Sequence, residues 1–300
     1  MVSSALNLLL FSGLALGSLV DRRQLAPAVS TASSNAQVTL LSEVHNISKN
    51  RASLNSDAST YYLGYREEDF AKPYAKFWNP NVPELSDETQ KGISSSPHAS
   101  KLTFTANEAA KIMLEPGYLQ MENGYAIDDN GTVMVAVRSE IPQVTGEMYD
   151  WWFGWHTTES ARYKLWNPVA HQYAYRKPDS EDWSNKTYAE RYWGMVSWID
   201  EFVGNSAAKL SIEFIPPSEL GVDTAKWAET EYVSEGFDNI SYLLHQVRRK
   251  PDGYRELRSR FWIAHGTPQL GHDLAVHCFT EMTHLGTFLP ELFAEFKDTV

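Results

Sequence analysis

Three side chains near the end of the chain have the spacing of a helical metal site. His277, Glu281 and His284 stand at i, i+4 and i+7 in AVHCFTEMTHLGTFLPELFAEF, so a helix would place them on one face. Imidazole and carboxylate groups one turn apart can bind a divalent ion without distorting the backbone. A solvated polar face on an amphipathic helix is the alternative. The apolar residues that follow favour a buried helix, in which histidine and glutamate need a partner or an ion.

A further candidate, His156, lies in the most aromatic segment, GEMYDWWFGWHTTESARYKLW. If this segment is helical throughout, Tyr149, Trp152, His156, Glu159 and Tyr163 form one stripe. Such a stripe is typical of a hydrophobic core or of a pocket whose aromatic rings hold a flat ligand. We expect the imidazole to have a polar partner in either case.

Size and charge limit the kinds of protein to which such sites can belong. The 300 residues, 43% hydrophobic and 13% aromatic, suffice for one large domain or a domain plus an extension. The net charge of −12 and the short longest basic run, RRK at 248–250, argue against a nucleic-acid partner. The single cysteine, Cys278, excludes an intrachain disulfide, and we expect it in the core.

The first 20 residues, MVSSALNLLLFSGLALGSLV, have an apolar run of signal-peptide length. Ser and Gly interrupt this run, which is too short for a membrane-spanning helix, so we expect a cleaved secretory leader and no stable membrane insertion. Four N-glycosylation sequons, at Asn46, Asn130, Asn185 and Asn239, are consistent with an extracellular location.

Residue patterns predict the elements that must position these side chains. Residues 24–60 lack a clear period and should form a flexible extension, and 72–97, rich in proline, should be irregular. We expect a hairpin over 118–138 around Asp-Asn-Gly, helices over 146–160 and 237–249, strands over 210–215 and 257–265, and a final helix from about 272. The mixture predicts an α+β domain in which an antiparallel sheet wraps a long C-terminal helix.

Five motifs, in order, carry a resemblance to a known family: DWWFGWH, RYKLWNPVAH, YWGMVSWIDEFVG, LRSRFWIAHG and HCFTEMTHLGTFLPELFAEF. Together they resemble the family of 2,4-diacetylphloroglucinol hydrolase and phloretin hydrolase over about residues 100–300. The resemblance implies a Bet v 1-like helix-grip fold and a hydrolase with one Zn²⁺ per chain. It also implies cleavage of the carbon–carbon bond between an acyl group and a phenolic ring. With the leader and the extension read from the residues, we expect a signal peptide at 1–20 and a partly flexible extension at 21–75, and from the resemblance the hydrolase-like domain at 76–300.

The resemblance also implies which side chains form the site. The metal ligands it implies are His156, Glu190, His277 and Glu281, with Glu181 as the alternative to Glu190. His284 is a rival ligand, and if it binds zinc, Glu190 is structural. His245 in SYLLHQVRR matches the family's catalytic histidine that is not a ligand.

The side chains that would contact the substrate are harder to place. Tyr149 is the first candidate to hold a phenol oxygen, Tyr232 a weaker one, and either could be a core tyrosine. His171 either hydrogen-bonds a loop or lines the pocket.

The residue types fit this chemistry. A bound zinc ion polarises a ketone and activates water, and His245 is suited to move a proton. The partner is then a small aromatic or polyketide-type substrate, and a homodimer is left open. The segment between RSRFWIAHG and HCFTEM is short for bacterial members, and together with the leader it keeps open a secondary-metabolite cyclase or isomerase such as a pericyclase. A non-catalytic small-molecule binding protein is a separate alternative.

Overall fold

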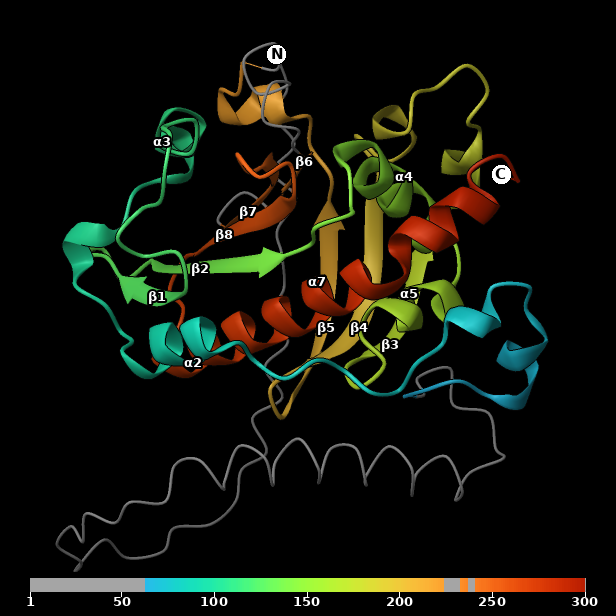
Figure 1. Cartoon of the computed structure of the whole chain (residues 1–300), viewed down its shortest axis with the longest axis horizontal. Coiled ribbons are helices and arrows are strands. Elements are labelled where there is room, and N and C mark those ends of the chain that lie inside the picture. Colours follow the sequence, from blue (N-terminus) through green and yellow to red (C-terminus); the bar gives the residue numbers. More distant parts are fainter. Residues whose placement is uncertain (1–62, 224–232, 237–240, 300) are drawn as a thin grey trace, which may run out of the picture. The chain divides into compact units, whose positions relative to one another are not determined.

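Two antiparallel sheets and one long helix organise the chain (Figure 1). The computed structural model describes residues 63–223, 233–236 and 241–299, all within the compact unit that spans 48–300. Sheet A has the strand order β1 (Gly124–Ile127), β2 (Val133–Glu140), β8 (Arg255–Ile263), β7 (Ser241–Arg249) and β6 (Val233–Gly236). Sheet B has the order β3 (His171–Arg176), β4 (Val196–Val203) and β5 (Ser206–Glu213).

The helices lie against these sheets. They are α2 (Asp87–Ser94), α3 (Ala106–Ile112), α4 (Gly146–His156), α5 (Ser160–Trp166) and α7 (Pro268–Phe296). Short 3₁₀ turns connect them: η1 (Glu67–Ala71), η2 (Ala75–Phe77), η3 (Ser100–Leu102), η4 (Pro178–Glu181), η5 (Ala189–Arg191) and η6 (Pro217–Leu220). The predicted α+β class with antiparallel sheets and a long C-terminal helix is confirmed.

Helix α7 packs closely on sheet A and also contacts β4 of sheet B. Thr267 caps its first turn by accepting a hydrogen bond from the Leu270 amide, and Pro268 occupies the first helical position, where its missing N–H costs nothing. At Gly271 a Cβ atom would come within 2.9 Å of Tyr125 and Val133, so glycine permits the close approach to β1 and β2. This contact fixes the first turns of α7 against sheet A, and His277 and Glu281 follow further along the same helix.

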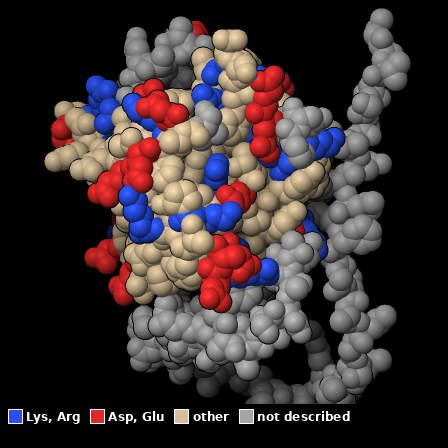
Figure 2. Space-filling view, turned by 90° about the vertical axis from the view of Figure 1, so that its right-hand side faces the viewer, with Lys and Arg blue, Asp and Glu red and all other residues tan. Residues whose placement is uncertain are grey.

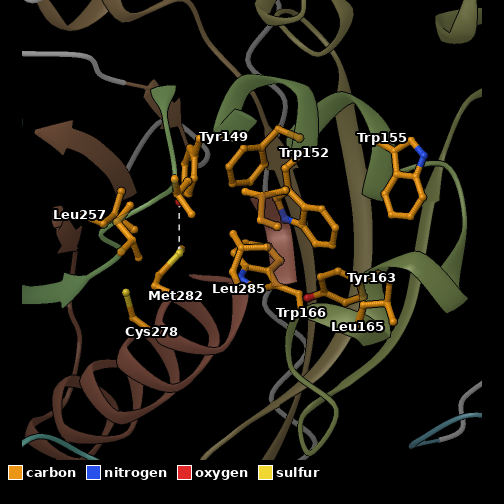
Figure 3. Close-up of a cluster of buried hydrophobic side chains, with 14 of the residues drawn as sticks. Tyr149, Trp152, Trp155, Tyr163, Leu165, Trp166, Leu257, Cys278, Met282 and Leu285 are labelled. Atoms are coloured by element: carbon orange, nitrogen blue, oxygen red, sulfur yellow. Dashed lines mark hydrogen bonds between the residues drawn. The ribbon is translucent and has the colours of Figure 1, made fainter. Parts of the chain in front are cut away.

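The main core fills the space among α7, α4, α5 and the inner faces of the two sheets. Figure 3 shows part of it, with Tyr149 and Trp152 of α4 near Met282 and Leu285 of α7. A second core cluster covers the opposite face of sheet A, under α3 and η6. Sheet A is therefore buried on both faces.

The predicted hairpin over 118–138 is confirmed as β1 and β2. Its loop is held by the Asp128 carboxylate, which accepts hydrogen bonds from the amides of Asn130 and Thr132, both at 2.8 Å. Gly131 has a φ of +83°, which a residue with a side chain rarely adopts. The predicted strands over 210–215 and 257–265 correspond to β5 and β8.

The prediction of a helix over 237–249 is wrong, because the described part of that segment, 241–249, is strand β7. Leu243, His245 and Val247 face α7, while Leu244 and Gln246 face the second core. With both faces buried, the strand lacks the alternation of apolar and polar residues that marks a strand with one exposed face.

Two other expectations need correction. The segment 146–160 is not one helix: α4 ends at His156, where the Thr157 and Thr158 hydroxyls bond back to carbonyls of the last turn. The segment 72–97 is not wholly irregular, since it contains η2 and α2.

Residues 63–75, expected within the extension, pack on the core through Tyr65, whose hydroxyl donates to the Ala161 carbonyl at 2.8 Å.

The surface carries charges of both signs. On the face in Figure 2, acidic and basic side chains are interspersed, with no extended basic area. Among the residues that the structure describes, no helix combines the length and the apolar composition required to cross a bilayer.

Candidate metal centre

Two histidines and two glutamates from three elements converge in the interior. His171 begins β3, Glu201 lies on β4, and His277 and Glu281 lie one turn apart on α7. His171 Nε2 lies 3.4 Å from Glu201 Oε2 and 3.3 Å from Glu281 Oε2, and His277 Nε2 lies 3.7 and 3.5 Å from the same two atoms. Their exposed fractions are 0% to 8%. We call these four residues the metal cluster.

Backbone carbonyls fix the tautomers of both imidazoles. His171 Nδ1 lies 3.0 Å from the Tyr163 carbonyl oxygen, and His277 Nδ1 lies 3.0 Å from that of Phe202. A carbonyl oxygen only accepts hydrogen bonds, so each Nδ1 carries a proton and each Nε2 faces the carboxylates. His171 Nε2 is fully buried and has no hydrogen-bond partner among the described residues.

The electrostatics of the metal cluster favour a cation. Burial lowers the pKa of His277, but Glu201 and Glu281 outweigh it and raise the pKa to about 9. Burial raises the pKa of Glu281, but His277 and His171 outweigh it and hold that pKa at about 2. Two buried carboxylates thus hold a proton on an imidazole, and a divalent ion bound by the same atoms would replace that proton.

The donor set fits a metal ion. Ligand atoms of His171, Glu201 and His277 all lie within 4.8 Å of one another, and Glu281 approaches both imidazoles. The two carboxylates balance the charge of a divalent ion, the two imidazoles are neutral, and zinc accepts donors of both types.

Tyr163 of α5 supports two members of the metal cluster. Its hydroxyl donates to Glu201 Oε2, and its ring stacks on His171 with centroids 3.7 Å apart and planes 5° apart. Burial and the nearby Glu201 raise the pKa of Tyr163 well above its usual value, so the hydroxyl keeps its proton. Tyr163 therefore orients both a histidine and a carboxylate.

The structure brings the predicted pair His277 and Glu281 together, but it does not place His156 in the metal cluster. His156 Nδ1 lies 2.8 Å from the Trp152 carbonyl oxygen, and the centroid of its ring lies 5.8 Å from that of Tyr163. Burial lowers the pKa of His156 to about 3, so the side chain is neutral. His156 thus borders the metal cluster within the aromatic core.

The other predicted ligands also lie elsewhere. Glu190 is exposed in η5, where it accepts hydrogen bonds from the Thr187 amide and hydroxyl at 2.8 and 2.7 Å. Glu181 is exposed at a surface hollow. His284 is buried one turn beyond Glu281, against Phe288, and burial lowers its pKa to about 4. It is not in the group of mutually close ligand atoms.

His245 and Tyr149 lie in the same interior, on sheet A and α4. The His245 ring lies 5.9 Å from that of Tyr149, and its Nδ1 lies 2.7 Å from Ser259 Oγ. Burial lowers the pKa of His245 to about 4, although Glu281 opposes the shift. The Tyr149 hydroxyl approaches Met282 Sδ at 3.1 Å, one residue from Glu281 (Figure 3). Tyr232 lies outside the described residues.

Sequence reasoning did not predict Glu201 as a member of the metal cluster and left His171 open as a pocket residue. A signal for Glu201 exists in VSWIDEFV, where Ser197, Ile199, Glu201 and Val203 share the buried face of β4. A carboxylate on the buried side of an alternating strand needs a partner, as His277 does on its helix.

An α+β fold that buries two histidines and two glutamates around one point is typical of a metalloenzyme. Comparisons with known proteins specify the class. The family model described as DAPG hydrolase PhiG domain matches residues 104–269, and the chain belongs to this family of hydrolases. The resemblance read from the five motifs is thereby confirmed.

Two relatives illustrate the family. The chain is 30% identical to 2,4-diacetylphloroglucinol hydrolase of Pseudomonas protegens, over 75% of this chain and 85% of the relative. It is 28% identical to phloretin hydrolase of Eubacterium ramulus, over 79% and 95%. The matched family region includes His171 and Glu201 and ends before α7 supplies His277 and Glu281.

Proposed function

We propose that the chain is a zinc-dependent hydrolase that cleaves the carbon–carbon bond between an acyl group and a phenolic, phloroglucinol-type ring. The observation that carries the proposal is the metal cluster, in which two imidazole Nε2 atoms and two carboxylates face one point. The names of its relatives, a diacetylphloroglucinol hydrolase and a phloretin hydrolase, supply the substrate class.

The ligand set that we propose is His171, Glu201, His277 and Glu281. It keeps two of the residues expected from the sequence and replaces His156 and Glu190. His156 is held against the Trp152 carbonyl and stacks near the Tyr163 ring. Glu190 is exposed and bonded to Thr187.

The reaction adds water across the bond between the acyl carbon and the ring carbon. The water oxygen becomes part of the carboxylic acid product, and the ring carbon takes the electron pair of the broken bond and a proton. A bound zinc ion would polarise the acyl carbonyl and lower the pKa of water toward neutrality. A phenol assists the departure, because the electron pair can spread onto a ring oxygen.

The chain's own side chains would hold and orient the substrate. The ring centroids of Tyr149 and His245 lie 5.9 Å apart in the interior of the domain. Both side chains could bind oxygens of the substrate's phenolic ring there. Tyr163 fixes Glu201 and His171 in place. The rings of Trp152 and Trp166, which lie 6.1 Å apart in this core, keep water from the site (Figure 3).

The test is metal content by plasma mass spectrometry, combined with product analysis on 2,4-diacetylphloroglucinol and phloretin. We expect about one zinc per chain and release of acetate or of the phenylpropanoic acid. A Glu201→Gln variant should lose both zinc and activity, whereas Glu190→Gln, a surface control, should keep both.

Other results would select the alternatives. A folded chain that binds no metal but binds these phenols tightly would be a binding protein. A chain that converts a substrate without adding water would be a cyclase or isomerase on the same scaffold.

Location and assembly belong to the same proposal. The leader at 1–20 would send the chain to the secretory pathway. Asn130 and Asn185 are exposed and could carry glycans, while Asn46 and Asn239 lie outside the described residues. We retain the helix-grip relationship and the homodimer as proposals, testable by a solved structure and by light scattering.

A further inference from the structure

The interior histidines differ in the group that their Nδ1 atoms face. Three of them, His156, His171 and His277, have Nδ1 at 2.8, 3.0 and 3.0 Å from backbone carbonyl oxygens. His245 instead has Nδ1 at 2.7 Å from the hydroxyl of Ser259 on the neighbouring strand. A carbonyl oxygen accepts only, whereas a hydroxyl can donate or accept.

This difference decides which nitrogen of His245 carries the proton. Ser259 Oγ is buried, and its hydrogen bond to His245 is the only side-chain hydrogen bond that the described residues offer it. If Nδ1 donated to Oγ, the hydroxyl proton would be buried without an acceptor, which is unfavourable. The favoured arrangement has the hydroxyl donating to Nδ1, so the proton of the imidazole resides on Nε2.

We propose that Ser259 is a positioning residue that holds His245 as the Nε2–H tautomer, with a bare Nδ1, whereas His156, His171 and His277 carry a proton on Nδ1. His245 then presents a hydrogen-bond donor to the interior beside Tyr149. This inference rests on the proposed function for its catalytic meaning. A neutral Nε2–H would donate to the ring oxygen that receives charge as the carbon–carbon bond breaks, without giving up its proton.

The proposal assigns His245 a specific chemical role. With its Nδ1 occupied by Ser259 and its Nε2 protonated, His245 has no lone pair with which to accept a proton from water. It acts as an electrophile that stabilises negative charge on a substrate oxygen. The proton that reaches the ring carbon must then come from the attacking water or from the solvent.

The tautomer can be measured without activity. In chain labelled with ¹⁵N-histidine, correlation spectra through the ring carbons distinguish a protonated nitrogen from a bare one, and His245→Gln identifies the His245 signals. We expect a protonated Nε2 and a hydrogen-bonded, unprotonated Nδ1 for His245. A protonated Nδ1 in the parent chain would overturn the proposal.

Kinetics of an isosteric pair tests the role of the hydroxyl. Ser259→Thr keeps the hydroxyl, and Ser259→Val has the same shape without it, so any strain from the added methyl group is common to both. We expect Thr to keep kcat within about threefold and Val to lower it about tenfold, with KM changed by less than about threefold. Equal kcat values for the two variants would contradict the proposal.

A matched control lies on the adjacent strand. Ser139 of β2 is also buried, and its hydroxyl has no hydrogen-bond partner among the described residues. Ser139→Ala should leave kcat and the His245 spectrum unchanged, and a loss equal to that of Ser259→Val would mean that the effect is general to this sheet. If the parent hydrolyses neither phenol, the proposed function fails, while the spectrum of His245 still decides the tautomer.

Discussion

Two buried clusters of charged side chains lie in different parts of this fold and balance their charges differently. In the metal cluster, between sheet B and α7, two carboxylates face the Nε2 atoms of two imidazoles. On the face of sheet A turned away from α7, Glu122 faces the guanidinium groups of Arg258 and Arg260. Glu122 accepts from Arg258 at 2.7 Å and also pairs with Arg260.

The two clusters differ in the positive charge that balances each buried carboxylate. Glu122 has permanent cations built into the chain, and they hold its pKa at about 2 although burial raises it. Glu201 and Glu281 face His171 and His277, whose positive charge depends on a bound proton. The first cluster is complete within the chain, and the second is complete only with a proton or a metal ion.

Removal of a ligand should have the largest effect. A His171→Ala variant should lose bound zinc and reduce turnover by more than the 10- to 100-fold that changes around a metal site cost. The reason is that two carboxylates would face a single imidazole. Plasma mass spectrometry and kcat on 2,4-diacetylphloroglucinol measure both effects, and full zinc occupancy in the variant would exclude His171 as a ligand.

Disruption of the Glu122 cluster should affect stability instead of metal content. Glu122→Gln leaves Arg258 and Arg260 buried without a counter-charge, and we expect a loss of about 3–5 kcal/mol in the free energy of unfolding. Urea denaturation measures this loss. Zinc per folded chain should stay unchanged, and a parallel fall in zinc would show that the two clusters are not independent.

Acid should weaken the parent chain through the same residue. The pKa of Glu122 falls from 4.5 to about 2 on folding, so its contribution is present above pH 4.5 and is lost as the pH falls toward 2. The shift corresponds to about 3 kcal/mol. The free energy of unfolding, measured by urea denaturation at several pH values between 5 and 2.5, should fall less steeply with decreasing pH for Glu122→Gln than for the parent. An equal pH dependence in the two chains would contradict the assignment.

Loss of the Tyr163 hydroxyl should produce a smaller effect on the metal cluster. Tyr163→Phe keeps the ring stacked on His171 but removes the hydrogen bond to Glu201. We expect zinc affinity to fall about 10- to 100-fold, because this bond orients a ligand. Competition with a chelating dye measures it. The control is Tyr175→Phe, at an exposed tyrosine on β3, the strand that begins with His171, and it should leave the affinity unchanged.

The smallest effect is expected at Glu190. Its carboxylate is exposed and bonds only Thr187 in the described structure, so Glu190→Gln should change stability by no more than about 0.5 kcal/mol. Zinc content should be unchanged. Loss of zinc in this variant would restore the ligand set first expected from the sequence.

Local patterns predicted the parts of this molecule that depend on local spacing. The helix that carries His277 and Glu281 follows from a 3.6-residue period, and the first hairpin follows from Asp-Asn-Gly between apolar segments. Both appear in the structure as α7 and as β1 with β2. The motifs were sufficient to identify the family.

Long-range pairing determined what the sequence did not reveal. His171 meets Glu201 because β3 pairs with β4, with His171 opposite Glu201 in the register, and no periodicity encodes that pairing. The aromatic setting of His156 resembles a binding site, but the side chain is satisfied by the Trp152 carbonyl. Strand β7 looked helical because both of its faces are buried.

The central claim is that His171, Glu201, His277 and Glu281 hold one zinc ion. Diffraction from crystals of the zinc-loaded chain, recorded on both sides of the zinc absorption edge, tests it most directly. We predict one anomalous peak within bonding distance of all four side chains. A peak beside His156 or Glu190, or no peak in a chain that hydrolyses its substrate, would contradict the account.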